Sequence, residues 1–205
     1  MDIGNSYLKS VNKQFNQYKL LGEKVINQLE AEQLFVTQHA NSNSIAVIIR
    51  HLHGNMLSRW TDFLTADGEK PWRKRDDEFE DDCTEKNLVI RNWEEGWACF
   101  FKAISSLSAE QLSETIFIRG EAHTVMDAIN RQLAHYSYHV GQIVFAAKQL
   151  KEGNWDSLSI PGEKTNLSCR GTRHLLVIKA CFIHPFSHLL YHYYAFLALT
   201  ILSKY

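Results

Sequence analysis

The stretch Asn130–Leu150, "NRQLAHYSYHVGQIVFAAKQL", has the pattern of a core-forming helix that also carries two histidines, His135 and His139. Apolar residues recur along it at steps of three and four, and "KEGN" ends the pattern. Because four residues span little more than one helical turn, both rings lie on one face within reach of a common point. The pair permits a shared metal ion, but it is equally compatible with an ordinary helix surface.

Three earlier segments show the same amphipathic periodicity, with polar residues between the apolar ones. Ser44 is a plausible N-cap for the second helix, and Thr124 for the last one. The segment "TIFIRGEAHTV" predicts a small hairpin around a glycine turn. Since no strands alternate with the helices, we predict an all-α protein, a four-helix bundle with one long crossover between its second and third helices. The first three helices are expected at about 6–29, 44–63 and 84–107.

The predicted crossover contains "ADGEKPWRKRDDEFEDDC", which mixes charges of both signs around Trp72. A charge run is usually a solvated connection. However, so long a linker is uncommon in a compact bundle unless it is functional or disordered, and a tryptophan has little reason to lie in a floppy segment. We therefore expect an ordered loop that folds against the bundle as a lid.

Composition narrows the classes of function. The 205 residues are 45% hydrophobic and 12% aromatic, which is ample for a packed core. The formal net charge of -1 argues against nucleic-acid binding. The four cysteines form no CxxC pair, which disfavours a zinc ribbon or a redox motif and favours a reducing cytoplasm. The polar, amphipathic start gives no indication of a signal peptide.

Helix bundles hold metal ions between facing helices, so a partner for the pair of histidines is sought on another helix. The second helix offers His51 and His53 in "IIRHLHGNMLSRW". On a helical wheel His51, Asn55 and Arg59 form a polar row along one edge of the apolar stripe. His53 lies on the opposite flank, where we expect a packed or partly exposed residue.

On the last helix His135, His139 and Gln142 likewise border the apolar stripe, so the two polar edges could meet in one cleft. Three neutral imidazoles with open positions would suit zinc or another borderline divalent ion. The competing interpretation is that these histidines bind no metal, because a chain with ten histidines will often place two of them four residues apart on a helix. The glutamate of an HExxH protease motif is missing, so that class is not supported.

Three stretches resemble a known superfamily: "SIAVIIRHLHGNMLSRWTDFLTADGEKPWRKRDDEF", "AHYSYHVGQIVFAAKQL" and "WDSLSIP". Together they are similar to the DinB-like superfamily, the YfiT-type metal-binding four-helix bundles, and within it to a subgroup of unassigned function. The similarity spans about Tyr7 to Pro161. It implies one metal-binding histidine on the second helix, matched by His51, and two on the last, matched by His135 and His139.

The resemblance also implies a range of functions. Relatives include metal-dependent transferases that attach low-molecular-weight thiols to electrophiles, and hydrolases. Either chemistry needs a divalent metal, zinc first with nickel, manganese or iron as alternatives, that activates a thiol or water. The competing class is a non-catalytic, stress-related metal-binding or dimerising bundle. We expect a small-molecule partner, such as a thiol, and assembly as a homodimer. The sequence does not identify catalytic residues.

Several polar residues near the expected cleft are candidates for contacting a substrate. An arginine could hold a carboxylate of a thiol or of an acidic substrate. An equally good interpretation makes the arginines surface ion-pair partners of nearby aspartates. The substrate-binding candidates are Asn55, Arg59, Trp72, Arg73 and Gln142.

The end of the chain has a different character, because no acidic residue follows Glu163. The uncharged run Ala180–Ser203 is long enough to span a bilayer, but Pro185 and three histidines weaken that interpretation. This part also falls outside the resemblance. We therefore expect a bundle domain at 1–166 and an extension at 167–205, which comes from a shifted reading frame, a recent addition or a hydrophobic tail.

Overall fold

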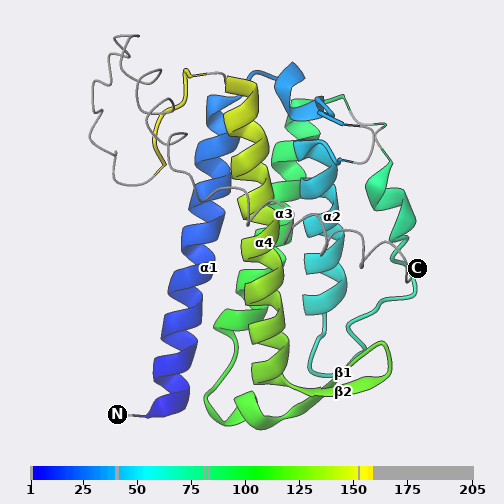
Figure 1. The fold of residues 1–205 in the computed structure, drawn as a ribbon. Coiled ribbons are helices and arrows are strands. Elements are labelled where there is room, and N and C mark those ends of the chain that lie inside the picture. The colour runs from blue at the N-terminus through cyan, green and yellow to red at the C-terminus, as the bar shows by residue number, and fades with distance from the viewer. Residues whose placement is uncertain (1, 40–41, 81, 83, 152, 159–205) are drawn as a thin grey trace, which may run out of the picture. The chain divides into compact units, whose positions relative to one another are not determined.

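Four long helices and one short hairpin make up the described part of the chain (Figure 1). The computed structural model describes residues 2–39, 42–80, 82, 84–151 and 153–158. The predicted four-helix bundle with a long connection between its second and third helices is confirmed. The elements are α1 (Ile3–Gln28), α2 (Ile45–Trp60), α3 (Lys86–Ser105), β1 (Thr115–Ile118), β2 (Glu121–Thr124) and α4 (Val125–Lys151), with 3₁₀ helices at Glu32–Phe35, Asp76–Phe79 and Glu110–Ser113.

Side-chain caps mark the starts of α2 and α4. The Ser44 hydroxyl accepts a hydrogen bond from the backbone N–H of Val47 at 3.2 Å, which satisfies one of the free donors of the first turn of α2. At the start of α4, Thr124 Oγ1 accepts from the N–H of Asp127 at 3.0 Å, and the Asp127 carboxylate accepts from the Thr124 N–H at 3.4 Å. Both predicted caps are confirmed.

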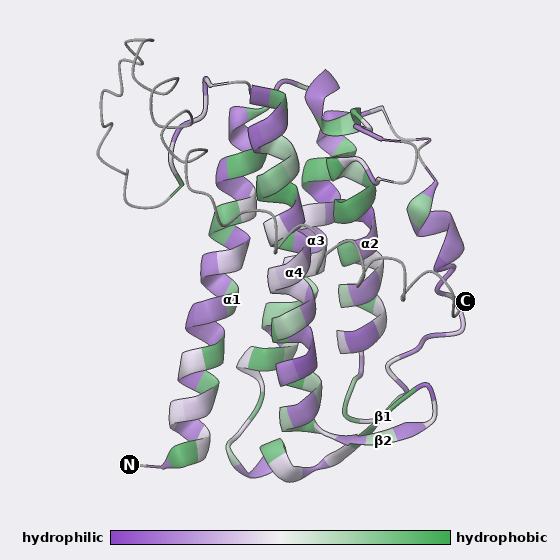
Figure 2. Ribbon diagram, in the orientation of Figure 1, coloured by the Kyte–Doolittle hydropathy of each residue, from purple (hydrophilic) through white to green (hydrophobic). Residues whose placement is uncertain are grey.

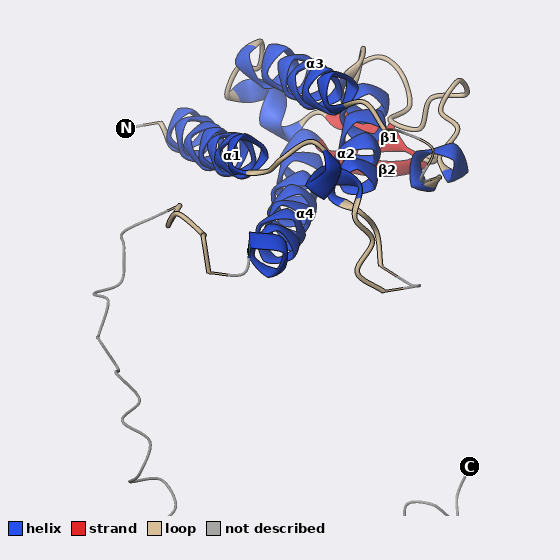
Figure 3. Cartoon of the chain, turned by 90° about the horizontal axis from the view of Figure 1, so that it is seen from above, coloured by secondary structure: helices blue, strands red, loops and turns tan. Residues whose placement is uncertain are grey.

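The helices form a ring in which α1 neighbours α3 and α4, and α2 neighbours the same two helices (Figure 3). Hydrophobic and hydrophilic residues alternate along each helix, as amphipathic packing requires (Figure 2). Aromatic rings fill the centre: the Phe15 and Phe100 centroids are 4.3 Å apart, and those of Trp97 and Tyr136 are 5.6 Å apart. These side chains are almost fully buried, so packed aromatic rings fill the space that the four helices enclose.

The predicted hairpin is confirmed and lies at one end of the bundle, close to the start of α4 (Figure 1). Its strands are antiparallel, with Ile118 opposite Glu121. Arg119 and Gly120 form the turn with φ values of +57° and +74°, the two positive values that a type I′ turn needs. The N–H of Gly68 donates to the Phe117 carbonyl at 2.8 Å, which ties the crossover to the hairpin.

The crossover packs against α2 through its 3₁₀ helix Asp76–Phe79, as expected of an ordered loop. Trp72, which suggested an ordered loop, is itself 54% exposed. Buried polar side chains make the contacts instead, above all Glu78, which is 7% exposed. Hydrogen bonds to α2 therefore hold the loop in place, together with a contact between the Phe79 and His51 rings, whose centroids are 4.9 Å apart.

The domain boundary predicted at 166 and the whole extension at 167–205 lie outside the described residues. Within the part of the chain that the structure describes, none of the helices carries an apolar run that could cross a membrane.

Candidate metal centre

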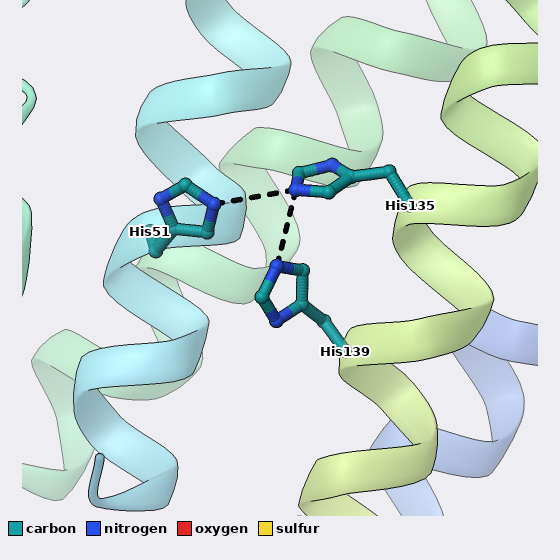
Figure 4. Close-up of side chains that lie close together, drawn as sticks. All are labelled: His51, His135 and His139. Atoms are coloured by element: carbon teal, nitrogen blue, oxygen red, sulfur yellow. Dashed lines mark hydrogen bonds between the residues drawn. The ribbon is translucent and has the colours of Figure 1, made fainter. Parts of the chain in front are cut away.

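Three histidines from two facing helices meet at one point (Figure 4). The Nε2 atoms of His51 on α2 and His135 on α4 are 3.3 Å apart, and those of His135 and His139 are 3.1 Å apart. One ligand atom from each ring lies within 4.8 Å of the other two. The cluster could hold a metal ion, and the residues that the sequence nominated are the ones that converge.

The partners of the remaining ring nitrogens explain why Nε2 is free to bind a cation. His51 Nδ1 lies 2.9 Å from the Glu78 carboxylate, and His139 Nδ1 lies 2.8 Å from the Gln142 amide oxygen. Both oxygens are acceptors, so each Nδ1 carries the proton and each Nε2 presents a lone pair. His135 Nε2 can donate to only one of these lone pairs, which leaves the other without a proton. Such a donor set fits a cation better than a hydrogen-bonded cluster.

Burial keeps the two histidines of α4 neutral. Desolvation, with the neighbouring histidines adding to it, lowers the pKa of His135 to about 3. The same causes lower the pKa of His139 to about 4, against a smaller opposite effect of Gln142. Both rings are therefore uncharged near pH 7, and the neutral imidazole is the form that binds metal ions.

Glu78 is the key outer contact of the cluster. Burial raises the pKa of its carboxyl, but hydrogen bonds from His51 and Arg73 outweigh burial and hold this pKa below its ordinary value. Arg73 binds the carboxylate with two nitrogens, Nε at 2.7 Å and Nη2 at 2.9 Å. A Cβ atom at Gly54 would lie 2.2 Å from Glu78 Oε1, so only glycine at this position lets the carboxylate approach α2 so closely.

The third histidine has no such partner among the described residues. His135 Nδ1 is buried without a hydrogen bond, and so is the Oε1 atom of Gln132, one turn earlier on α4. The two are complementary, because an Nδ1–H donates and an amide oxygen accepts. Gln132 is therefore the natural candidate to orient His135 once its Nε2 serves as a ligand.

A pocket of about 190 Å³ opens beside the cluster. Three of the predicted substrate-binding residues, Asn55, Arg59 and Arg73, line it. The described lining includes neither Trp72, which faces solvent, nor Gln142, whose oxygen is held by His139. The full lining is His51, Asn55, Arg59, Arg73, Arg75, Arg119, Arg131, Gln132 and His135.

The polar groups on the α2 side of the pocket are held by buried contacts. The Tyr136 hydroxyl donates to Asn55 Oδ1 at 3.3 Å and accepts from Trp60 Nε1 at 3.0 Å. Arg59 donates from Nη1 to the Glu69 carboxylate at 3.0 Å and also to the Gly68 carbonyl. Their orientation is therefore set before any ligand arrives.

Sequence reasoning placed some residues well and missed others. His53 lies apart from the cluster on another side of α2, as the helical wheel predicted; there it faces α3, with Nε2 3.4 Å from a Glu95 carboxylate oxygen. Glu78 was missed because it belongs to a charge run whose usual interpretation is a solvated loop. Arg119 and Arg131 were also missed, since nothing in their local sequence indicates that they share a pocket with the histidines.

Comparison with known proteins gives a family but no activity. No curated protein matches the chain. The family described as "Protein of unknown function (DUF1572)" matches residues 2–164, a range that includes all four helices and the three histidines. Because this match covers well over half of the chain, the protein belongs to the DUF1572 family.

Proposed function

We propose that His51, His135 and His139 bind a divalent metal ion, zinc first with nickel, manganese or iron as alternatives, and that the protein is a metal-dependent enzyme. The observation that carries the proposal is the convergence of three Nε2 atoms, two of them with Nδ1 already tied to an acceptor. A divalent ion held by neutral imidazoles lowers the pKa of a thiol or water in its open position and so supplies a nucleophile near neutral pH. The reaction is then thiol transfer to an electrophile, or hydrolysis.

The protein's own groups have distinct tasks in this scheme. Glu78 and Gln142 hold the Nδ1 protons of His51 and His139, which keeps both rings oriented. Asn55, Arg59 and Arg73 face the substrate from the adjoining pocket. We assign no catalytic role beyond the metal ligands.

Family considerations support the same conclusion. The resemblance to the DinB-like superfamily rests on the segment around His51 and on the last bundle helix, where all three expected histidines are present. Relatives of that superfamily include thiol transferases and hydrolases, so we place the protein among them. A low-molecular-weight thiol is the preferred substrate, and a homodimer the expected assembly.

The alternative is a non-catalytic, metal-binding or dimerising bundle. Such a protein needs no cavity at its metal ion. The pocket that His51 and His135 share with several polar side chains favours a catalytic centre, because it gives a small molecule access to the cluster.

Metal content tests the ligand set. Purified protein is dialysed against each metal ion and then against metal-free buffer, and the bound metal is measured by mass spectrometry. We expect His51→Ala, His135→Ala and His139→Ala to lose the metal, because each removes a ligand. His53→Ala is the matched control and should retain it. Loss in His53→Ala with retention in His51→Ala would place the site on the other side of α2.

Turnover tests the reaction. Metal-loaded protein is incubated with bacillithiol, mycothiol, glutathione or coenzyme A and a generic electrophile, with metal-free protein as the control. Metal-dependent consumption of one thiol supports the transferase. Inactivity with every thiol, together with metal-dependent ester or amide cleavage, supports the hydrolase. Tight metal binding without either activity favours the non-catalytic alternative.

A further inference from the structure

Five arginines line the pocket beside the histidines, although the chain as a whole carries a net charge of -1. They come from four separate segments: α2, the crossover, the hairpin turn and α4. Figure 1 shows the hairpin next to the ends of α2 and α4, which explains how these segments share one cavity. The five are Arg59, Arg73, Arg75, Arg119 and Arg131.

Two carboxylates neutralise part of this charge. Glu69 accepts from Arg59 Nη1 at 3.0 Å and from Arg119 Nε at 2.9 Å. Glu78 is bound by two nitrogens of Arg73. Because the other oxygen of Glu69 also lies 3.8 Å from Arg73 Nη1, Glu69 serves three arginines with one negative charge.

The remaining charge is not balanced by the described residues. Neither Arg75 nor Arg131 forms an ion pair within the part of the chain that the structure describes; Arg75 lies 5.3 Å from the ring centroid of Phe79. Five guanidinium groups against two carboxylates leave three positive charges. Counting Asp67 as well, whose carboxylate accepts from the backbone N–H groups of the turn, still leaves two.

Arg119 has an unusual backbone conformation. Its φ of +57° is a backbone conformation that long side chains rarely adopt, and the first central position of a type I′ turn favours Asn, Asp or Gly. An arginine here keeps a strained backbone while its side chain reaches Glu69 and the pocket. Strain of this kind is retained where a side chain serves a function.

We propose that this pocket binds the anionic group, a carboxylate or a phosphate, of a small substrate whose reacting end lies at the three histidines. Guanidinium groups bind both anions through paired hydrogen bonds. A volume of about 190 Å³ is below the ~300–1,000 Å³ of pockets for drug-sized ligands, so the bound part is small. His51 and His135 line the same cavity, so an anchored anion also positions the reacting atom. The assignment of the reacting end rests on the proposed function, whereas the anion site can be tested apart from it.

The test is a calorimetric titration of metal-free, full-length protein with inorganic phosphate and with malonate at low salt, and sodium chloride serves as the nonspecific anion. The variants are Arg119→Gly and Arg131→Gln. Glycine relieves the backbone strain at the turn, so it removes the guanidinium without weakening the hairpin through its backbone. Arg91→Gln, an exposed arginine on α3 outside the pocket, is the matched control for Arg131→Gln.

We expect at least one of the two probes to bind, and each pocket variant to weaken its affinity by about tenfold or more, as expected for losing a hydrogen bond to a charged group. Arg91→Gln should bind like the unmodified protein. Preference for phosphate identifies a phosphorylated substrate, and preference for malonate a carboxylate. Binding that chloride matches, or that Arg91→Gln weakens equally, overturns the proposal.

A zinc titration of the same variants separates the two proposals. Zinc binding should be unchanged in Arg119→Gly and Arg131→Gln, because neither is one of the three ligands and neither forms a hydrogen bond to them among the described residues. Zinc binding without anion binding would overturn the pocket proposal and leave the metal centre intact. Anion binding without binding of zinc, nickel, manganese or iron would support the pocket and overturn the proposed function.

Discussion

Gly54 on α2 lies against the carboxylate of Glu78, so the substitution Gly54→Ala should disturb the metal centre without removing any of its groups. The added Cβ would lie 2.2 Å from Glu78 Oε1 and 2.7 Å from its Cδ. Ordinary contact begins at 3.4 Å, so the carboxylate must retreat by about 1.2 Å. The other oxygen of the same carboxylate, Oε2, lies 2.9 Å from His51 Nδ1, so displacing the carboxylate disturbs that hydrogen bond.

The magnitudes follow from these contacts. Losing the outer partner of a metal-binding histidine typically weakens metal affinity by about 10- to 100-fold. The Glu78 and Arg73 side chains are 8% and 2% exposed, and separating such a buried pair costs about 3–5 kcal/mol. In a helix interior, alanine is more favourable than glycine by about 1 kcal/mol of helix stability. We therefore expect net destabilisation by about 2–4 kcal/mol, opposite in sign to the propensity effect.

Zinc affinity is measured by competition with a chromophoric chelator, and stability by urea unfolding of the metal-free protein. Gly141→Ala is the matched control, since it changes a helical glycine on α4 around which a Cβ meets nothing within 4 Å. It should gain helix stability and keep zinc affinity. In a double-mutant cycle, Gly54→Ala should add little to Glu78→Ala, because both act through one carboxylate.

Unchanged zinc affinity in Gly54→Ala, together with a stability gain like that of Gly141→Ala, would refute the reasoning. It would mean that Glu78 does not orient His51. The reasoning would also be refuted if Gly54→Ala lowered zinc affinity and stability as much in the Glu78→Ala variant as in the unmodified protein. The substitution would then act without the Glu78 carboxylate.

Three further predictions concern the core, the pocket and the tail. Tyr136→Phe removes the hydroxyl that hydrogen-bonds to buried Asn55 Oδ1 and Trp60 Nε1, so urea unfolding should show a loss of stability of about 1–3 kcal/mol. Burial raises the pKa of Glu69, but hydrogen bonds from two arginines outweigh it, and the net pKa lies below the ordinary 4.5. A depressed carboxyl pKa contributes stability above the unfolded pKa, and this is lost as pH falls through the folded pKa. The stability difference between the unmodified protein and Glu69→Gln should thus be constant above about pH 5 and shrink below about 4.5; a constant difference would contradict the shift. Truncation after Asn166 should leave the melting temperature nearly unchanged, because four helices complete a core by themselves; a large loss would show that the tail packs on the bundle.

The amino-acid sequence by itself determined the helices, the caps of two of them and the histidines of the cluster. Periodic apolar residues specify a helix and its buried face, and Ser44 and Thr124 mark starts, because these effects act over one or two turns. The spacing of His135 and His139 is likewise local. The place of His51 followed from its polar row on α2, since a bundle brings such an edge against a neighbouring helix.

Only the tertiary structure decided the surroundings of that cluster. Glu78 meets His51 across 27 residues of sequence, and Arg119 and Arg131 join the pocket from the turn and from α4. Local sequence cannot distinguish a carboxylate in a solvated charge run from one that becomes buried beside a glycine. It also could not show that Trp72 is exposed. Helices form from short-range periodicity, whereas the partner of a polar side chain depends on how distant segments pack, and that is settled only when the whole core forms.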